Sequence, residues 1–273
     1  MIGVHRCEGV PDMMLRLLVY SLSSLLGVWP ASAELETIDE IDACVRKNQH
    51  HESSVGIIVL KSVDRIGATT ESRATIHWKR FENDLNRVYL RFSDPPDLRG
   101  SALLLIEKEN TDDMFMYLPE LEKVRRVTGR MVTGSMFGTD FTYEQFQRLQ
   151  GMADDVSSER LPDAEEQGRA VFVVAHTPNQ EEGSQFEKVV TYADKETCVP
   201  LRTEYFEKGA RLRKVLTADP AKVKQNGGAW IPEEMVMKDL RDETETFLVV
   251  EKLEMGAKIS RKMFSQGNLA RGN

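Results

Sequence analysis

The sequence has few of the residues that carry most enzyme chemistry. Its 273 residues include five histidines and three cysteines. No serine lies in a G-x-S-x-G turn, and no cysteine lies beside a histidine. His50 and His51 are adjacent and have no cysteine or acidic partner at metal-ligand spacing. The glycine-rich segment Gly134–Gly138 precedes a predicted helix, but no Lys-Ser/Thr pair follows its second glycine, unlike in phosphate-binding loops. We therefore expect no catalytic residue, no metal site and no cofactor.

The sequence also lacks an excess of positive charge and a long apolar run. Its 36 basic and 44 acidic residues give a net charge of -8, which argues against nucleic-acid binding. The mostly apolar run Leu15–Trp29 is too short for a comfortable transmembrane helix, which needs about 20 residues. It contains Arg16 and is followed by the small residues of Pro30–Ala33. This arrangement predicts a secretory signal peptide, residues 1–33, cleaved after Ala33.

We therefore expect the mature chain, residues 34–273, to be exported to the periplasm without a transmembrane anchor. Cys7 precedes the apolar run, so it is not placed as the acylated cysteine of a lipoprotein. Cys44 and Cys198 remain. In an oxidising compartment such a pair is often bridged, and a disulfide between them is one interpretation. Two buried free thiols are the other.

Apolar periodicity predicts a mainly β domain with a few helices. Residues 34–48 have helical spacing and a capping box formed by Thr37 and Glu40. A second capping box, Thr142 with Gln145, predicts a short helix to about residue 149. Most of the remaining sequence alternates apolar and polar residues in about a dozen strands, and Trp230–Asp239 is expected to be one of them. One strongly curved antiparallel sheet in a single domain, 34–273, is the economical arrangement, because a sheet of this size curls or closes.

Alternation sends every second side chain of such a sheet to its concave face, where an apolar cavity would suit acyl chains. The paired methionines would adapt to ligands of variable shape. The candidates for this cavity are Ile76, Trp78, Leu90, Phe92, Met114, Met116, Met136, Phe137, Met235 and Met237. The alternative is that these residues pack a core under the helices.

Three sequence segments carry a resemblance to a known family. They are Phe92–Gly100 (FSDPPDLRG), Met116–Val127 (MYLPELEKVRRV) and Gly134–Glu144 (GSMFGTDFTYE). With them, the mature chain resembles the outer-membrane lipoprotein-sorting protein family of LolA-like proteins. The resemblance implies an incomplete β-barrel, wrapped around an apolar cavity and partly covered by helices. It also implies lipid or lipoprotein acyl chains as cargo, and an inner-membrane transporter of the resistance-nodulation-division (RND) type as a partner.

The Pro95-Pro96 break, the basic cluster after it and the glycine-rich loop before Thr142 are expected to form a lid across the barrel mouth. Its polar candidates are Lys123, Arg125, Arg126 and Asp140. The basic residues have two interpretations. They contact a lipid phosphate or carboxylate, for which arginine is well suited, or they tie the segment to Asp140, Glu120 or Glu144. The glycines of residues 128–140 would allow the lid to move.

These observations predict a periplasmic carrier that shields a lipid or a lipoprotein acyl chain and performs no covalent chemistry. The alternative is a structural or adaptor subunit of an envelope transporter complex, with an interior filled by side chains.

Overall fold

Long alternating strands dominate the computed structural model, which describes residues 35–272 except 36, 49–52, 83, 154 and 182. The predicted signal peptide and its cleavage site lie outside the described residues. The first strands are β1 (Ser53–Val63), β2 (Thr69–Arg80), β3 (Asn86–Asp94), β4 (Ala102–Ile106), β5 (Asp113–Leu118) and β6 (Lys123–Arg126). The later ones are β7 (Asp155–Glu166), β8 (Arg169–Pro178), β9 (Phe186–Asp194), β10 (Pro200–Glu207), β11 (Arg211–Ala218), β12 (Val223–Asn226), β13 (Ala229–Pro232), β14 (Glu234–Asp239) and β15 (Thr244–Met255).

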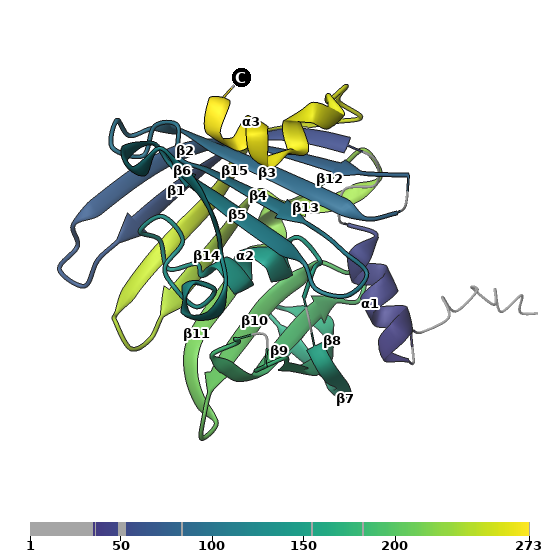
Figure 1. Ribbon diagram of the computed structural model, residues 1–273. Coiled ribbons are helices and arrows are strands. Elements are labelled where there is room, and N and C mark those ends of the chain that lie inside the picture. The colour runs from purple at the N-terminus through teal and green to yellow at the C-terminus, as the bar shows by residue number, and fades with distance from the viewer. Residues whose placement is uncertain are drawn as a thin grey trace, which may run out of the picture. The chain divides into compact units, whose positions relative to one another are not determined.

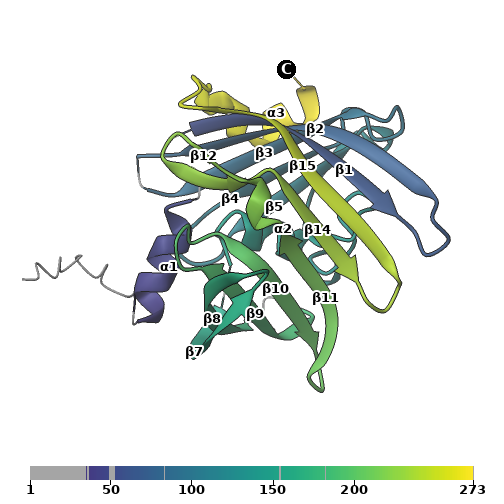
Figure 2. The same ribbon diagram turned by 180° about the vertical axis from the view of Figure 1, so that it is seen from behind.

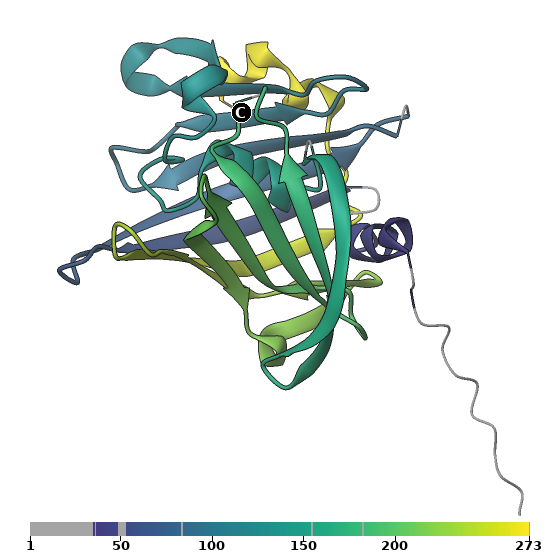
Figure 3. The ribbon, with the colours of Figure 1, turned by 90° about the horizontal axis from the view of Figure 1, so that it is seen from below.

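Thirteen of these strands form one antiparallel sheet in the order β6-β5-β4-β3-β2-β1-β15-β14-β11-β10-β9-β8-β7 (Figure 1). Most neighbours are consecutive hairpins. The first strand, β1, pairs with the last strand, β15. These two strands lie side by side with β14 in Figure 2. The sheet curves until its two halves face each other, and its edge strands β6 and β7 do not pair (Figure 3). The expected curved, incompletely closed antiparallel sheet is confirmed.

Three α-helices accompany the sheet in the described residues: α1 (Ile38–Arg46), α2 (Tyr143–Leu149) and α3 (Gln266–Arg271). The capping boxes at Thr37 and Thr142 both form, with each threonine accepting a hydrogen bond from the backbone three residues later. The first helix is shorter than the predicted 34–48 because it begins only after its cap at Thr37. Among the described residues, no helix combines the length and the apolar character that crossing a membrane requires.

Two features differ from the sequence-based expectation. The expected strand Trp230–Asp239 divides at Glu233, and its first part pairs with β12 in a separate hairpin. The C-terminal segment also forms an unexpected cover, made of the 3-10 helix η4 (Arg261–Phe264) and α3 (Figure 1). Phe264 and Leu269 of this cover pack against the outer face of the sheet.

The main core lies on the concave side of the sheet, with α2 between the two halves (Figure 3). Side chains of α2 and of the segment before it, such as Phe141 and Phe146, belong to the same buried cluster as Leu90 and Leu103 of the sheet. A helix inside a curved sheet buries side chains around much of its circumference, which agrees with buried Tyr143, Gln145 and Phe146. The concave side is therefore partly filled by the protein itself.

Candidate functional site

An apolar cavity of about 470 Å³ remains on the concave side. Its walls come from α1, α2 and the strands β1, β2, β7–β11 and β13–β15. Its lining includes Ile76, Trp78, Phe146, Leu216, Met235 and Leu248. The volume lies within the range of roughly 300–1,000 Å³ that small-molecule sites occupy.

The structure divides the ten predicted cavity residues into separate groups. Ile76, Trp78 and Met235 line the apolar cavity. Met114 lines a second, more polar cavity. The buried residues Leu90, Phe92, Met116, Met136 and Met237 belong to the main core.

Phe137 explains why the predicted set is divided. It packs against the same core, with its ring centroid 4.7 Å from that of Phe92 and 6.2 Å from that of Tyr143. The glycine-rich segment and α2 are folded into this part of the concave side and occupy the space that a ligand would need. These six residues therefore pack in the core under α2 and do not line the apolar cavity.

The apolar cavity has a charged end made of Arg148 on α2, Asp155 on β7 and His176 on β8. Both terminal nitrogens of Arg148 donate to the Asp155 carboxylate, at 2.9 and 2.5 Å. The Nδ1 atom of His176 lies 2.9 Å from the Ser158 hydroxyl and 3.5 Å from Asp155. Burial lowers the pKa of His176, which favours its neutral form.

The second cavity, of about 580 Å³, lies beside the unpaired edge of the sheet. It is lined from β5, β6, α2 and the β8–β9 connection, and it contains the charged residues Glu107, Lys108, Asp112, Arg126, Glu144 and Arg148. Glu144 is largely buried, and this burial raises the pKa of its carboxyl to about 7. Sequence reasoning did not identify Glu144 and Arg148 as a pair, although their four-residue spacing on a predicted helix places them on one face.

The basic residues of β6 lie on the exposed edge of the sheet. Arg126 and Lys108 both form ion pairs with Asp113. The ion-pair partner of Arg126 is thus Asp113 rather than Asp140, Glu120 or Glu144, because the antiparallel register places β6 beside β5, which begins with Asp113. Lys123 and Arg125 are exposed and form no ion pair with any described residue.

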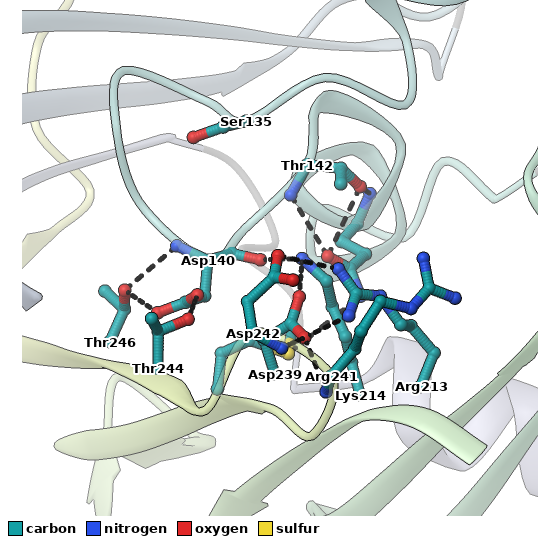
Figure 4. Close-up of polar contacts among 12 residues, drawn as sticks. Ser135, Asp140, Thr142, Arg213, Lys214, Asp239, Arg241, Asp242, Thr244 and Thr246 are labelled. Atoms are coloured by element: carbon teal, nitrogen blue, oxygen red, sulfur yellow. Dashed lines mark hydrogen bonds and ion pairs between the residues drawn. The ribbon is translucent and has the colours of Figure 1, made fainter. Parts of the chain in front are cut away.

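Asp140 instead fastens the glycine-rich segment to the strands, as Figure 4 shows. Its carboxylate accepts hydrogen bonds from Thr244 and, at 2.7 Å, from Thr246. Its backbone N–H donates to the Thr246 hydroxyl at 2.9 Å, and its carbonyl accepts from Lys214. Asp140 is thus a structural clasp.

The clasp continues into a buried charge network. Lys214 also lies 3.5 Å from Asp239, which pairs with Arg213 at 2.5 Å. Burial lowers the pKa of Lys214, while the charges of Asp239 and Asp140 act in the opposite direction. Neither Lys214 nor Asp239 was distinguishable in the sequence, because both belong to alternating strands rich in charged residues.

Helix α1 is held against the sheet at several points. Cys44 forms a disulfide with Cys198, and their Cα atoms are 5.6 Å apart. After the helix, the Asn48 side chain donates to the Thr197 carbonyl at 2.6 Å and accepts from the Trp230 backbone at 2.9 Å. Within the described ranges, no group of three or more His, Cys, Asp or Glu residues is arranged to hold a metal ion.

A family model described as an uncharacterized, DUF1329-like protein matches residues 84–271. The chain belongs to this family. No curated protein matches the sequence. The DUF1329 assignment agrees with a solved structure, a DUF1329 family protein from Desulfovibrio piger, which is 22% identical with a TM-score of 0.77 over 84% of this chain and 96% of that one.

Two other solved structures carry the fold named by the sequence resemblance. One is a putative outer membrane lipoprotein-sorting protein domain from Vibrio parahaemolyticus, 23% identical, with a TM-score of 0.74 over 85% of this chain and 97% of that one. The other is a LolA superfamily protein from Nitrosomonas europaea, 15% identical, with a TM-score of 0.69 over 85% and 99%. These similarities confirm the LolA-like fold and the resemblance seen in the sequence.

Proposed function

We propose that the protein is a periplasmic carrier that holds an acyl chain of a lipid or lipoprotein in the apolar cavity. The observation that carries this proposal is the cavity of about 470 Å³ on the concave side of a LolA-like sheet. Each methylene removed from water contributes about 0.8 kcal/mol, so one long chain would supply useful affinity before the cost of ordering it is subtracted. The predicted signal peptide and the Cys44–Cys198 disulfide are in keeping with an oxidising compartment.

Cargo transfer in this proposal follows differences in affinity among donor, carrier and acceptor. The family resemblance suggests an RND-type inner-membrane transporter as the donor or acceptor. Lys123 and Arg125 on the exposed edge strand β6 are the groups we assign to transient contact with lipid phosphates. Replacing both by glutamine should slow lipid extraction from anionic vesicles and leave extraction from neutral vesicles unchanged, because only the former depends on charge attraction.

The main test is occupation of the cavity. Native mass spectrometry of protein purified from the periplasm should show a bound lipid, and delipidated protein should bind a fluorescent fatty acid. Met235→Trp places a larger side chain in the cavity and should weaken binding by roughly tenfold, equivalent to about 1.4 kcal/mol. Lys238→Trp is the matched control, because Lys238 lies on the same strand and is exposed.

A structural or adaptor subunit is the second candidate, and the filled half of the concave side favours it. An adaptor would carry no lipid from the periplasm and would bind no fatty acid after delipidation. It would also respond equally to Met235→Trp and Lys238→Trp.

A further inference from the structure

The polar cavity adjoins the apolar one. Four residues line both: Arg148, Gly151, Ala153 and Tyr205. The two cavities therefore meet near the end of α2. Gly151 has no side chain there, and that of Ala153 is a single methyl group. An amphiphile with its chain on the apolar side would have its polar end directed towards the charged residues of the other cavity.

Glu144 has one carboxylate oxygen without a hydrogen-bond donor in that cavity. Its Oε1 atom is buried and accepts no hydrogen bond from the described residues, although Ser184 and the Gln185 backbone already favour the ionised form of the same carboxyl. Arg148 lies one helical turn further along α2, on the same face, but both of its terminal nitrogens are directed to Asp155. A buried carboxylate oxygen without a donor is unfavourable, so a ligand group that donates a hydrogen bond would be stabilised there.

The charges around the polar cavity indicate which ligand headgroup would donate this hydrogen bond. Each basic residue in the lining already has an acidic partner: Arg148 pairs with Asp155, and both Lys108 and Arg126 pair with Asp113. Counting these partners, five acidic residues face three basic ones. An anionic headgroup would find no uncommitted cation and would meet Glu144, whereas a cationic one would reduce the excess negative charge.

We propose that the polar cavity receives the ammonium-bearing end of an amphiphile whose chain lies in the apolar cavity, with Glu144 accepting a hydrogen bond from the ammonium. This inference rests on the proposed carrier function, and it adds the chemical class of the cargo. The raised pKa of Glu144 agrees with it, because a cation beside the carboxyl would offset the cost of ionising it in a buried position.

The test compares three amphiphiles with the same chain and different heads: dodecylamine, dodecanol and dodecanoate. Binding to the delipidated full-length mature protein is measured by displacement of a fluorescent fatty acid at about pH 8, where the amine stays protonated and Glu144 is mostly ionised. Dodecylamine should bind about tenfold tighter than either other amphiphile, as expected for one charge-assisted hydrogen bond. Equal affinities, or tighter binding of dodecanoate, would overturn the inference while leaving the carrier function in place.

Two matched variants test whether the preference for the amine depends on Glu144. Glu144→Gln should bring the ratio of amine to alcohol affinity close to one, whereas Glu165→Gln, an exposed change on β7, should retain it. A preference that survives Glu144→Gln would also overturn the assignment to this cavity. If the wild-type protein binds none of the three amphiphiles, the carrier function itself fails. The wild-type comparison requires no variant, so the inference stays testable if Glu144→Gln does not fold.

Discussion

Cys44 of α1 and Cys198, between β9 and β10, are linked across 154 residues of sequence by a disulfide. The link fixes a wall of the apolar cavity, because Val45 and Arg46, the next residues of α1, line that cavity. The neighbouring contacts of Asn48 with Thr197 and Trp230 hold the end of the same helix. Covalent and polar restraints therefore meet at one side of the proposed binding site.

Removing this disulfide should destabilise the protein. The variant Cys44→Ser with Cys198→Ser frees a long loop in the unfolded chain, and the free energy of unfolding should fall by about 2–5 kcal/mol. Urea unfolding followed by circular dichroism measures the change. Adding reductant to the wild-type protein should reproduce the variant, and reductant should leave the variant unaffected. A variant with the wild-type midpoint would show that α1 is held by its other contacts alone.

The clasp at Asp140 should set the stability of the glycine-rich segment. Asp140→Ala removes the acceptor for Thr244 and Thr246 and leaves the fully buried Thr246 hydroxyl without this partner. The expected loss is about 1–3 kcal/mol, together with faster amide hydrogen exchange in residues 134–142. Asp97→Ala, at an exposed position, is the control and should change neither measurement.

Amide hydrogen exchange should differ between the two parts of the segment 128–142 in the wild-type protein. Residues 134–142 are fastened by the Asp140 clasp and by a hydrogen bond of 2.8 Å from the Met136 N–H to the Phe141 carbonyl. Residues 128–133 include a short 3-10 helix, η2 (Gly129–Met131), with no buried residue. Hydrogen exchange should therefore be faster in 128–133 than in 134–142, which confines any lid movement to the first part. Equal protection of both parts at the level of the strands would refute a lid.

Local sequence patterns predicted the elements better than their arrangement. The capping boxes at Thr37 and Thr142 depend on residues three apart, and the alternation of the strands depends on residues two apart, so both can be read along the chain. The Pro95-Pro96 pair ends β3 for the same kind of local reason. These local signals were sufficient to predict a curved antiparallel sheet with short helices.

The filling of the concave side depends on contacts that no local pattern contains. Phe137 packs on Phe92, and Asp140 is bonded to Thr246, more than a hundred residues later. Alternation showed which side chains face inwards, but not that α2 and the glycine-rich segment would cover many of them. The same limit applies to the cavity residues: Ile76 and Leu90 have the same pattern, and only one of them lines the open space.

The Arg148–Asp155 pair at the boundary of the two cavities should be costly to break. Their side chains are 18% and 15% exposed, so Arg148→Met leaves a largely buried carboxylate with His176 as its remaining close partner. The expected loss is about 3–5 kcal/mol. The double variant Arg148→Met with Asp155→Leu should recover part of that loss, because it removes the orphaned charge. Arg99→Met, which breaks an exposed pair with Asp94, should cost at most about 1 kcal/mol.

Thermal or urea unfolding of the four proteins gives the comparison. A double variant no more stable than Arg148→Met would show that Asp155 is stabilised by other groups, and that the Arg148 loss reflects packing of its side chain.

Glu144 should make the free energy of unfolding depend on pH. Burial raises the pKa of its carboxyl from the ordinary 4.5 to about 7, against the opposing effects of Ser184 and Arg148. In the unfolded chain the carboxyl ionises at its ordinary pKa, so between about pH 4.5 and 7 the folded state binds more protons. The free energy of unfolding therefore falls as pH rises through this window, by up to about 3 kcal/mol from this residue.

The variant Glu144→Gln isolates this contribution, because all other titrating groups are shared with the wild-type protein. Urea unfolding at about pH 5 and about pH 8 should show the variant gaining stability relative to wild type at the higher pH, since it has no buried carboxylate to ionise. A relative stability that is the same at both values would mean that Glu144 titrates alike in the folded and unfolded chains. Its Oε1 atom would then already have a donor, and the polar cavity would have no unmatched acceptor for a cationic headgroup.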